Sequence, residues 1–225
     1  MAPKRRRSTE GENKKVLQKR NKNSPVVVFA HGAGAPSSSD WMIRWKNLLA
    51  DALNAVEVVT FDYPYISERK PPPKAEKLVE FHSDMVKKTV EKYPQHPLIL
   101  VGKSMGSRVG CMVAAKNDIE ASAVVCLGYP LKGTKGTIRD KPLLELTVPT
   151  MFVQGTKDGL CSLASLEQVR QKMKPLNTVH VIENGDHSFK IGKKNLEVAG
   201  ITQEEAEEQA VRAIGAFVSQ IINTR

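Results

Sequence analysis

The sequence has no apolar run long enough to cross a membrane, and its basic, polar N-terminus has no apolar signal-peptide core. We therefore expect neither a membrane protein nor a secreted precursor. Cysteine is scarce as well. The three cysteines are an odd number and lack the spacing of metal ligands; they are Cys111, Cys126 and Cys161. This usage favours a reducing compartment, so we expect a cytoplasmic protein, a nuclear protein, or both.

Acidic residues are rare in residues 1–24, which carry nine lysines and arginines against two glutamates. This segment holds +7 of the net charge of +10, and the rest of the chain only +3. A nearly neutral remainder argues against a nucleic-acid-binding domain. Residues 1–24 also lack apolar periodicity. We predict that they form a disordered basic arm and that residues 25–225 form one folded domain.

The basic arm has two possible roles. Pro3–Arg7 resembles a nuclear-localisation cluster, and Lys14-Lys15 resembles its second half. On this interpretation an import receptor or a protein complex binds residues 4–22. Alternatively, the arm is a solvated charged tail that aids solubility. Short basic clusters occur often by chance, so both interpretations remain open.

Apolar runs alternate with amphipathic segments along the rest of the chain. Strands are expected at Pro25–Ala30, Val56–Phe61, Leu98–Val101, Ala123–Leu127, Pro149–Val153 and Thr178–Ile182. Helices are expected at 37–53, 75–92, 163–173 and 202–222 and directly after residue 104, and loops at 66–74 and 128–139. This alternation predicts an α/β fold with a doubly wound, mainly parallel sheet of about six strands and helices on both faces.

A G-x-S-x-G sequence, residues 102–106, lies between the strand at Leu98–Val101 and the helical pattern that follows. In such a turn a Cβ at either glycine would clash, and the strain raises the Ser104 hydroxyl above the sheet edge at a helix N-terminus. A phosphate-binding P-loop would need glycine where Pro97 stands. A plain glycine-rich turn is the remaining alternative.

Three strand ends carry residues typical of nucleophilic catalysis: Ser104, Asp158 and His187. The order Ser–Asp–His is that of α/β-hydrolases. The histidine can take the serine proton near neutral pH, and the aspartate fixes the histidine tautomer. The backbone N–H groups of Met105 and Ala33 are the expected donors to the oxyanion. This chemistry requires no metal and no cofactor.

Each assignment has an alternative. His187 could be a surface histidine, and Asp186 and Asp140 compete with Asp158 for its role. We expect His31 to brace the loop 31–34 rather than to move protons. Cys161 is interpreted as a structural cysteine rather than a reactive one.

Six sequence blocks together resemble one family: His31–Gly34, Gly102–Arg108, Leu127–Pro130, Val148–Thr150, Gln154–Asp158 and Gly185–Phe189. It is the α/β-hydrolase-like family of the testis-expressed protein Tex30 and the third subunit of the NSL histone-acetyltransferase complex, akin to dienelactone hydrolases. The resemblance covers about residues 25–222. It implies a small hydrolase core without a large cap, and it carries the triad onto Ser104, Asp158 and His187. Dienelactone hydrolases use cysteine where Ser104 stands, so their nucleophile is not implied.

The sequence therefore predicts a serine hydrolase that acts on a small-molecule ester or thioester through an acyl-enzyme. The alternative is a non-catalytic scaffold subunit of a nuclear or chromatin complex, because the family includes members regarded as complex subunits. Candidate substrate-binding residues beside the nucleophile and in the loop after the first strand are Lys103, Arg108, His31, Gly32 and Gly34.

The charges of Lys103 and Arg108 allow two interpretations. Together with the positive end of the helix dipole, they would favour substrates that carry a carboxylate or phosphate. Alternatively, Arg108 pairs with an acid such as Asp62, and Lys103 is solvated.

Overall fold

Six parallel strands form one sheet in a computed structural model that describes residues 23–224 except 117 and 134–135. The strands are β1 (Val26–Ala30), β2 (Glu57–Phe61), β3 (Leu98–Lys103), β4 (Ala123–Leu127), β5 (Thr150–Gly155) and β6 (Asn177–Ile182). Their order across the sheet is β2-β1-β3-β4-β5-β6. The predicted doubly wound α/β fold is confirmed.

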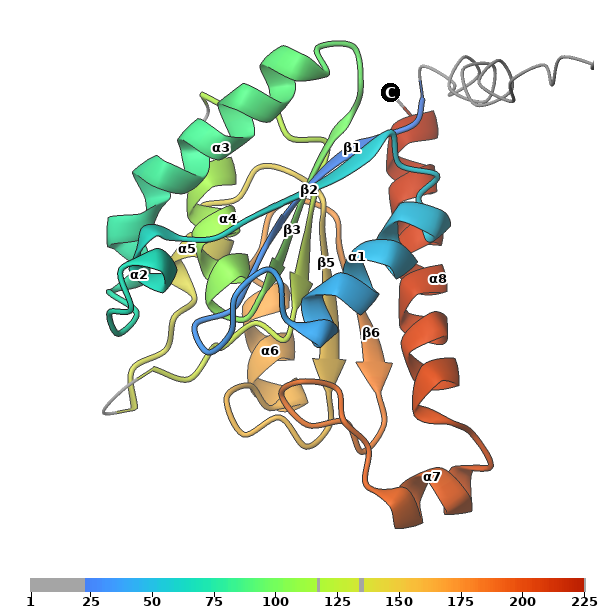
Figure 1. Ribbon diagram of the computed structural model, residues 1–225. Coiled ribbons are helices and arrows are strands. Elements are labelled where there is room, and N and C mark those ends of the chain that lie inside the picture. The colour runs from blue at the N-terminus through green and yellow to red at the C-terminus, as the bar shows by residue number, and fades with distance from the viewer. Residues whose placement is uncertain (1–22, 117, 134–135, 225) are drawn as a thin grey trace, which may run out of the picture.

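Helices cover both faces of the sheet (Figure 1). One face packs against α1 (Asp40–Ala52) and α8 (Gln203–Asn223). The other packs against α3 (Val79–Lys92), α4 (Met105–Ala114) and α6 (Leu163–Arg170). The shorter helices are α2 (Pro64–Ser67), the 3₁₀ turn η3 (Ala75–Leu78), α5 (Lys141–Leu144) and α7 (Lys193–Ala199). No helix in the described part of the chain has the length and apolar character of a membrane span.

The central strands are apolar along their whole length because each of their faces is covered. In β1, Val26 and Val28 belong to the core below α3 and α4, whereas Val27 and Phe29 belong to the core below α1 and α8. Each such side chain contributes about 1.5–3 kcal/mol when fully buried. This two-sided burial explains why β1 appears in the sequence as a continuous run rather than an alternation.

The order of the strands places two loops side by side. From β1 the chain moves to β2 on one side and then crosses back to β3 on the other side of β1. The direction in which strands are added therefore reverses at β1. Ala30 at the end of β1 pairs in register with Gly102 near the end of β3. The loop after β1 therefore lies next to the serine turn, at the switch point where parallel sheets bind ligands.

Several predicted boundaries are wrong. The helix expected at 37–53 begins at Asp40, and the one expected at 75–92 is divided into η3 and α3. The helix expected at 163–173 ends at Arg170. The short helices α5 and α7 were not predicted, and α2 overlaps the expected loop at 66–74. Helices of one or two turns are too short to show an apolar period in the sequence.

Most of the predicted basic arm lies outside the described residues, as do residues 4–22 to which we assigned a partner. Asn23 and Ser24 are described. Ser24 is buried, and its carbonyl oxygen accepts a hydrogen bond from His96 Nδ1 at 2.8 Å. Ser24 therefore belongs to the folded part of the chain rather than to the arm.

Candidate active site

Ser104 sits on a strained turn between β3 and α4. Its backbone has φ 51° and ψ −112°, a conformation rare for a residue with a side chain. A Cβ at Gly102 would lie 2.3 Å from the Ser107 nitrogen, and one at Gly106 would lie 2.5 Å from the Ala30 carbonyl oxygen. Both contacts are with backbone, so both positions require glycine. These distances agree with the steric demand of the G-x-S-x-G motif.

The structure brings Ser104, His187 and Asp158 into one chain of hydrogen bonds. The Ser104 Oγ lies 2.8 Å from His187 Nε2, and His187 Nδ1 lies 2.8 Å from Asp158 Oδ2. An ionised carboxylate can only accept, so Nδ1–H donates to Asp158, and Nε2 is left to accept the Ser104 proton. The serine follows β3, the aspartate follows β5 and the histidine follows β6.

Asp158 is buried but fully hydrogen-bonded. Its Oδ2 accepts from Gln154 Nε2 at 2.7 Å, and its Oδ1 accepts from the Leu160 N–H at 2.8 Å. Burial raises the pKa of this carboxyl, but the hydrogen bonds from His187, Leu160 and Gln154 outweigh burial and hold the pKa below its ordinary value. Asp158 therefore stays ionised beside the histidine at neutral pH.

The competing residues have other environments. Asp186 Oδ1 accepts from the backbone N–H groups of Ser188 and Lys190 at 2.7 and 2.9 Å, so this carboxylate shapes the turn that carries His187. Asp140 is the residue before α5. Cys161 is buried, and burial raises its thiol pKa to about 12, which disfavours a reactive thiolate.

The loop after β1 is held by buried polar groups. His31 Nε2 accepts from the Tyr63 N–H at 3.1 Å, so its proton lies on Nδ1, which donates to the Gly32 carbonyl oxygen at 2.6 Å. Burial lowers the pKa of His31 and favours this neutral form. The Tyr65 hydroxyl lies 3.3 Å from the carbonyl oxygens of Gly32 and Ala33. His31 thus acts as a brace, and Tyr65, which the sequence analysis missed, completes it.

Ala33 and Met105 line the same cavity as Ser104. Within the described residues, neither N–H donates a hydrogen bond to the protein. Two free donors beside a serine hydroxyl are suited to a developing negative charge. Gly32 and Gly34 are not required sterically: a Cβ at Gly32 meets ordinary contacts at 3.5 Å, and one at Gly34 meets open space.

The cavity in front of Ser104 has a volume of about 590 Å³. Its walls come from the loop after β1, the segment 72–76, the start of α4 and the loop that follows β4. The lining residues are Ala33, Pro72, Pro73, Lys74, Ala75, Glu76, Ser104, Met105, Arg108, Pro130, Thr137, Arg139 and Leu160. Arg139 was missed in the sequence, although its place at the end of the predicted loop 128–139 was a usable signal.

No three His, Cys, Asp or Glu side chains within the described residues are grouped to hold a metal ion.

Of the two interpretations of Lys103, that of a solvated side chain is wrong. Its side chain is buried, and Nζ donates to the backbone carbonyl oxygen of His187. Nζ also lies 5.6 Å from the ring centroid of Trp41 and 5.2 Å from that of Phe189. β3 continues through Lys103 instead of ending at Val101. As a strand residue, Lys103 packs within the protein and does not extend into solvent. Lys103 therefore supports the loop that carries His187.

Arg108 pairs with an acid, as one interpretation expected, but the acid is Glu76 and not Asp62. Arg108 Nη2 lies 3.2 Å from Glu76 Oε1 on the η3 turn. Asp62 instead accepts a hydrogen bond from the backbone N–H of Ser37 at 2.6 Å. The acid that pairs with Arg108 thus comes from a turn that was not distinguished in the sequence.

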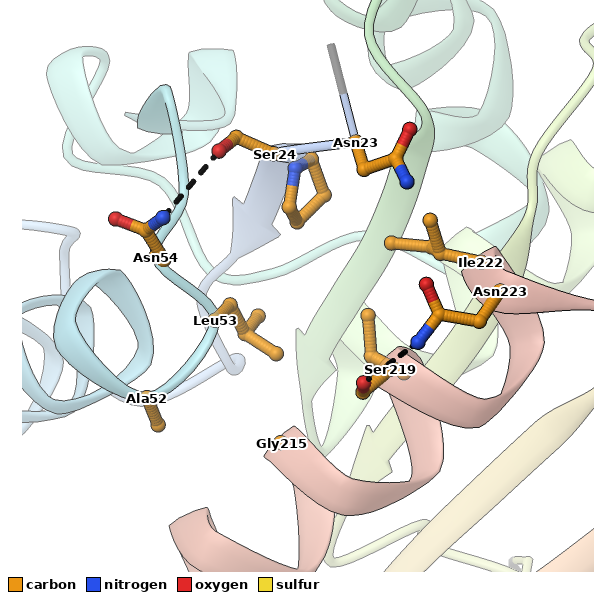
Figure 2. A pocket seen from close by; sticks show the side chains of 11 residues that line it. Asn23, Ser24, Ala52, Leu53, Asn54, Gly215, Ser219, Ile222 and Asn223 are labelled. Carbon is orange, nitrogen blue, oxygen red and sulfur yellow. Dashed lines mark hydrogen bonds between the residues drawn. The ribbon is translucent and has the colours of Figure 1, made fainter. Parts of the chain in front are cut away.

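A second cavity, of about 270 Å³, lies at the opposite end of the sheet (Figure 2). Figure 2 shows Asn54 hydrogen-bonded to Ser24 on one side and Asn223 hydrogen-bonded to Ser219 of α8 on the other. Ser24 precedes β1, so this cavity borders the amino ends of the strands. Ligands of parallel sheets bind at the carboxyl ends, which favours the cavity at Ser104 as the functional one.

Replacing Lys103 by methionine is expected to change how stability depends on pH. Burial lowers the pKa of Lys103 from 10.5 to about 8, against the opposing effect of Asp158 and Asp186. Below pH 8 both the folded and the unfolded chain carry the proton. Between about pH 8 and 10.5 only the unfolded chain binds it, so this lysine contributes stability that rises with pH. The unfolding free energy of wild type minus that of Lys103→Met should rise by up to about 3 kcal/mol in this window.

Urea unfolding at several pH values measures this difference. The matched control is Lys88→Met, which removes an exposed lysine of α3 and should show no comparable change. A wild-type-minus-Lys103→Met difference that is flat between pH 8 and 10.5 would contradict the burial of a charged Lys103.

Residues 23–219 match the model of a family described as an alpha/beta hydrolase domain. The fold is similar to that of a dienelactone hydrolase from Anabaena variabilis, with a TM-score of 0.63, 19% identity, and coverage of 82% of this chain and 86% of that one. At this level of sequence identity, the similarity shows a shared fold.

Two further solved structures show the same likeness. An alpha-beta serine hydrolase homologue from Coxiella burnetii has a TM-score of 0.64 and 14% identity, covering 85% of each chain. An esterase from Pyrococcus furiosus has a TM-score of 0.66 and 14% identity, covering 88% of this chain and 82% of that one. The matched lengths show that the described domain is similar in extent to these proteins.

Proposed function

This chain belongs to the α/β-hydrolase domain family, and on that basis we propose that it is a serine hydrolase that cleaves carboxylic esters or thioesters through an acyl-enzyme. The observation that carries the proposal is the pair of 2.8 Å hydrogen bonds that join Ser104 to His187 and His187 to Asp158. A hydroxyl next to a correctly oriented imidazole is the arrangement needed to activate serine.

In the first half of the reaction, Ser104 Oγ attacks the carbonyl carbon while His187 Nε2 takes its proton. Asp158 holds the imidazole by Nδ1 and stabilises the imidazolium that forms. The negative oxygen of the tetrahedral intermediate accepts hydrogen bonds from the N–H groups of Met105 and Ala33. Collapse of the intermediate expels the alcohol or thiol, to which His187 returns the proton.

In the second half, water attacks the acyl-serine. His187 now removes a proton from water, and a second tetrahedral intermediate uses the same N–H donors. Its collapse restores the Ser104 hydroxyl and releases the carboxylic acid. Every proton transfer uses His187, and the steps need only water as co-substrate.

A fluorophosphonate probe tests the proposal, because it labels only a serine that is activated as a nucleophile. We expect stoichiometric labelling of the wild-type protein at Ser104, located by mass spectrometry of the labelled peptide. The scaffold hypothesis predicts an unlabelled protein. Labelling at another serine, or none at all, would contradict the proposed mechanism.

We also propose membership of the narrower family of Tex30 and the third NSL subunit. It is supported by the six sequence blocks, which include the serine turn and the histidine loop. A cytoplasmic or nuclear location is proposed with it, on the basis of the basic cluster at Pro3–Arg7 and the low cysteine content.

Removal of residues 1–22 is expected to change location without changing stability. The segment has no apolar periodicity to bury, whereas Ser24 hydrogen-bonds the folded domain and should be kept. The melting temperature should stay within a few degrees of that of the full chain, and a fluorescent fusion should lose nuclear enrichment. A large fall in melting temperature would mean that the arm packs on the domain.

A further inference from the structure

The cavity at Ser104 carries more positive charge than a neutral ester requires. Among the residues that line it are three cations, Lys74, Arg108 and Arg139, and one acid, Glu76. Within the described lining this leaves a net charge of +2. Clefts with charge of one sign raise the local concentration of ligands of the opposite sign.

We propose that this cavity binds esters whose acyl chain ends in a free carboxylate, and that Arg108 and Arg139 recognise that carboxylate. The inference rests on the proposed hydrolase function and adds a substrate class to it. Hydrolysis adds water across the ester bond, so the products are a dicarboxylate and an alcohol or thiol.

Arg108 is held with one of its donors unused. Its side chain is only 13% exposed, and within the described residues its buried Nε has no hydrogen-bond partner. Its single ion-pair contact is the 3.2 Å bond from Nη2 to Glu76. Because this Nε is enclosed, a carboxylate in the cavity meets the terminal Nη groups of Arg108, which carry two N–H donors each and make one ion pair, with Glu76.

Arg139 is placed close enough to Arg108 for the two charges to oppose each other. Burial and the Arg108 charge both lower the pKa of Arg139, while Tyr129 and Glu76 act in the opposite direction. Its hydrogen bond from Nη1 to the Pro130 carbonyl oxygen is long, at 3.4 Å. Two guanidinium groups in a cavity that is lined by a single acid are stabilised when an additional anion binds.

Glu76 is a replaceable partner of this pair. Its side chain is 61% exposed and contacts Arg108 through one oxygen. An ion pair of such exposure contributes little, so a substrate carboxylate can take the place of Glu76.

A planar guanidinium binds a carboxylate through two parallel hydrogen bonds, a geometry that a single ammonium group does not offer. The apolar part of the lining, including Pro73, Met105 and Leu160, suits the methylene groups between ester and carboxylate.

Hydrolysis of matched esters tests the inference. The acidic esters are monomethyl succinate, glutarate and adipate, which vary the distance between ester and carboxylate. Each is compared with the neutral methyl ester in which an isopropyl group replaces the carboxylate, such as methyl 5-methylhexanoate for the glutarate. Acid release at constant pH yields kcat/KM, and the ratio of acidic to neutral ester is the measured quantity.

Wild type should prefer at least one acidic ester by about tenfold or more, as expected for hydrogen bonds to a charged group. Arg139→Met and Arg108→Lys should each lower that ratio about tenfold, and Glu76→Gln should raise it by removing the competing carboxylate. The control Arg212→Met removes an arginine that pairs with Glu208 on the outer surface of α8, and it should leave the ratio unchanged. Two arginine variants are used so that the loss of folding in one does not decide the outcome.

The inference is overturned if no acidic ester is preferred, or if both arginine variants keep the wild-type ratio. Failure of the proposed function has a different signature: neither ester class is hydrolysed, and the fluorophosphonate probe does not label Ser104. In that case calorimetric titration with glutarate, succinate and adipate decides. Binding that Arg139→Met abolishes supports a carboxylate site in a non-catalytic protein, and the absence of binding overturns it.

Discussion

Ser104→Ala is expected to lower the turnover of p-nitrophenyl acetate by about a million-fold, the loss seen when a serine protease loses its nucleophile. The substitution removes the atom that attacks the carbonyl carbon and leaves His187 without its 2.8 Å hydrogen-bond partner. The fold should be retained, because the turn depends on the glycines at 102 and 106 and not on the serine hydroxyl. Release of p-nitrophenolate measures the rate, and the melting temperature reports the fold.

The matched control for this variant is Ser188→Ala. Ser188 follows His187 directly, and its contacts in the described structure use its backbone N–H and carbonyl oxygen. Its hydroxyl should be dispensable for hydrolysis. Unchanged activity in Ser104→Ala would show that the esterase activity arises elsewhere, and equal losses in both variants would indicate a disturbed loop rather than a lost nucleophile.

His187→Ala is expected to produce a loss of the same size, on the order of a million-fold, because serine and histidine act as one unit. Without the imidazole the Ser104 proton has no base, and the leaving group has no acid. The double variant Ser104→Ala/His187→Ala should be no less active than either single variant, since each single change already disables the unit. Hydrolysis of p-nitrophenyl acetate at neutral pH provides all three rates.

His180→Gln is the control for this prediction. His180 lies on β6, the strand that leads to the histidine loop, and it is half-buried away from Ser104. Its replacement should leave hydrolysis near the wild-type level. Additive losses in the double variant, with the single variants each retaining substantial activity, would argue that Ser104 and His187 act independently.

The fold was predictable because its signals are local. Six buried strands appear as apolar runs, and their alternation with helices leaves few arrangements of a parallel sheet. The serine turn was predictable for the same reason: Gly102 and Gly106 must be glycine because backbone atoms lie within 2.3–2.5 Å of where a Cβ would be. Short elements such as α5 and α7 were missed because one or two helical turns leave no readable period.

The candidate site was predictable where a residue follows directly from the end of a strand. Ser104, Asp158 and His187 were found in this way, since the carboxyl ends of parallel strands meet at one edge of the sheet. Arg139 was missed because it lies at the far end of a loop. Lys103 was expected either to recognise substrate or to be solvated, yet two aromatic rings and a carbonyl oxygen lie near its ammonium group.

The sequence by itself determined the sheet, the serine turn and the three residues that follow strand ends, because each depends on neighbours along the chain. Only the tertiary structure decided the partners of the long charged side chains. Arg108 pairs with Glu76 and shares its cavity with Arg139, and these residues come from three separate segments. A flexible side chain reaches several possible partners, and the packing of distant segments determines which of them it meets.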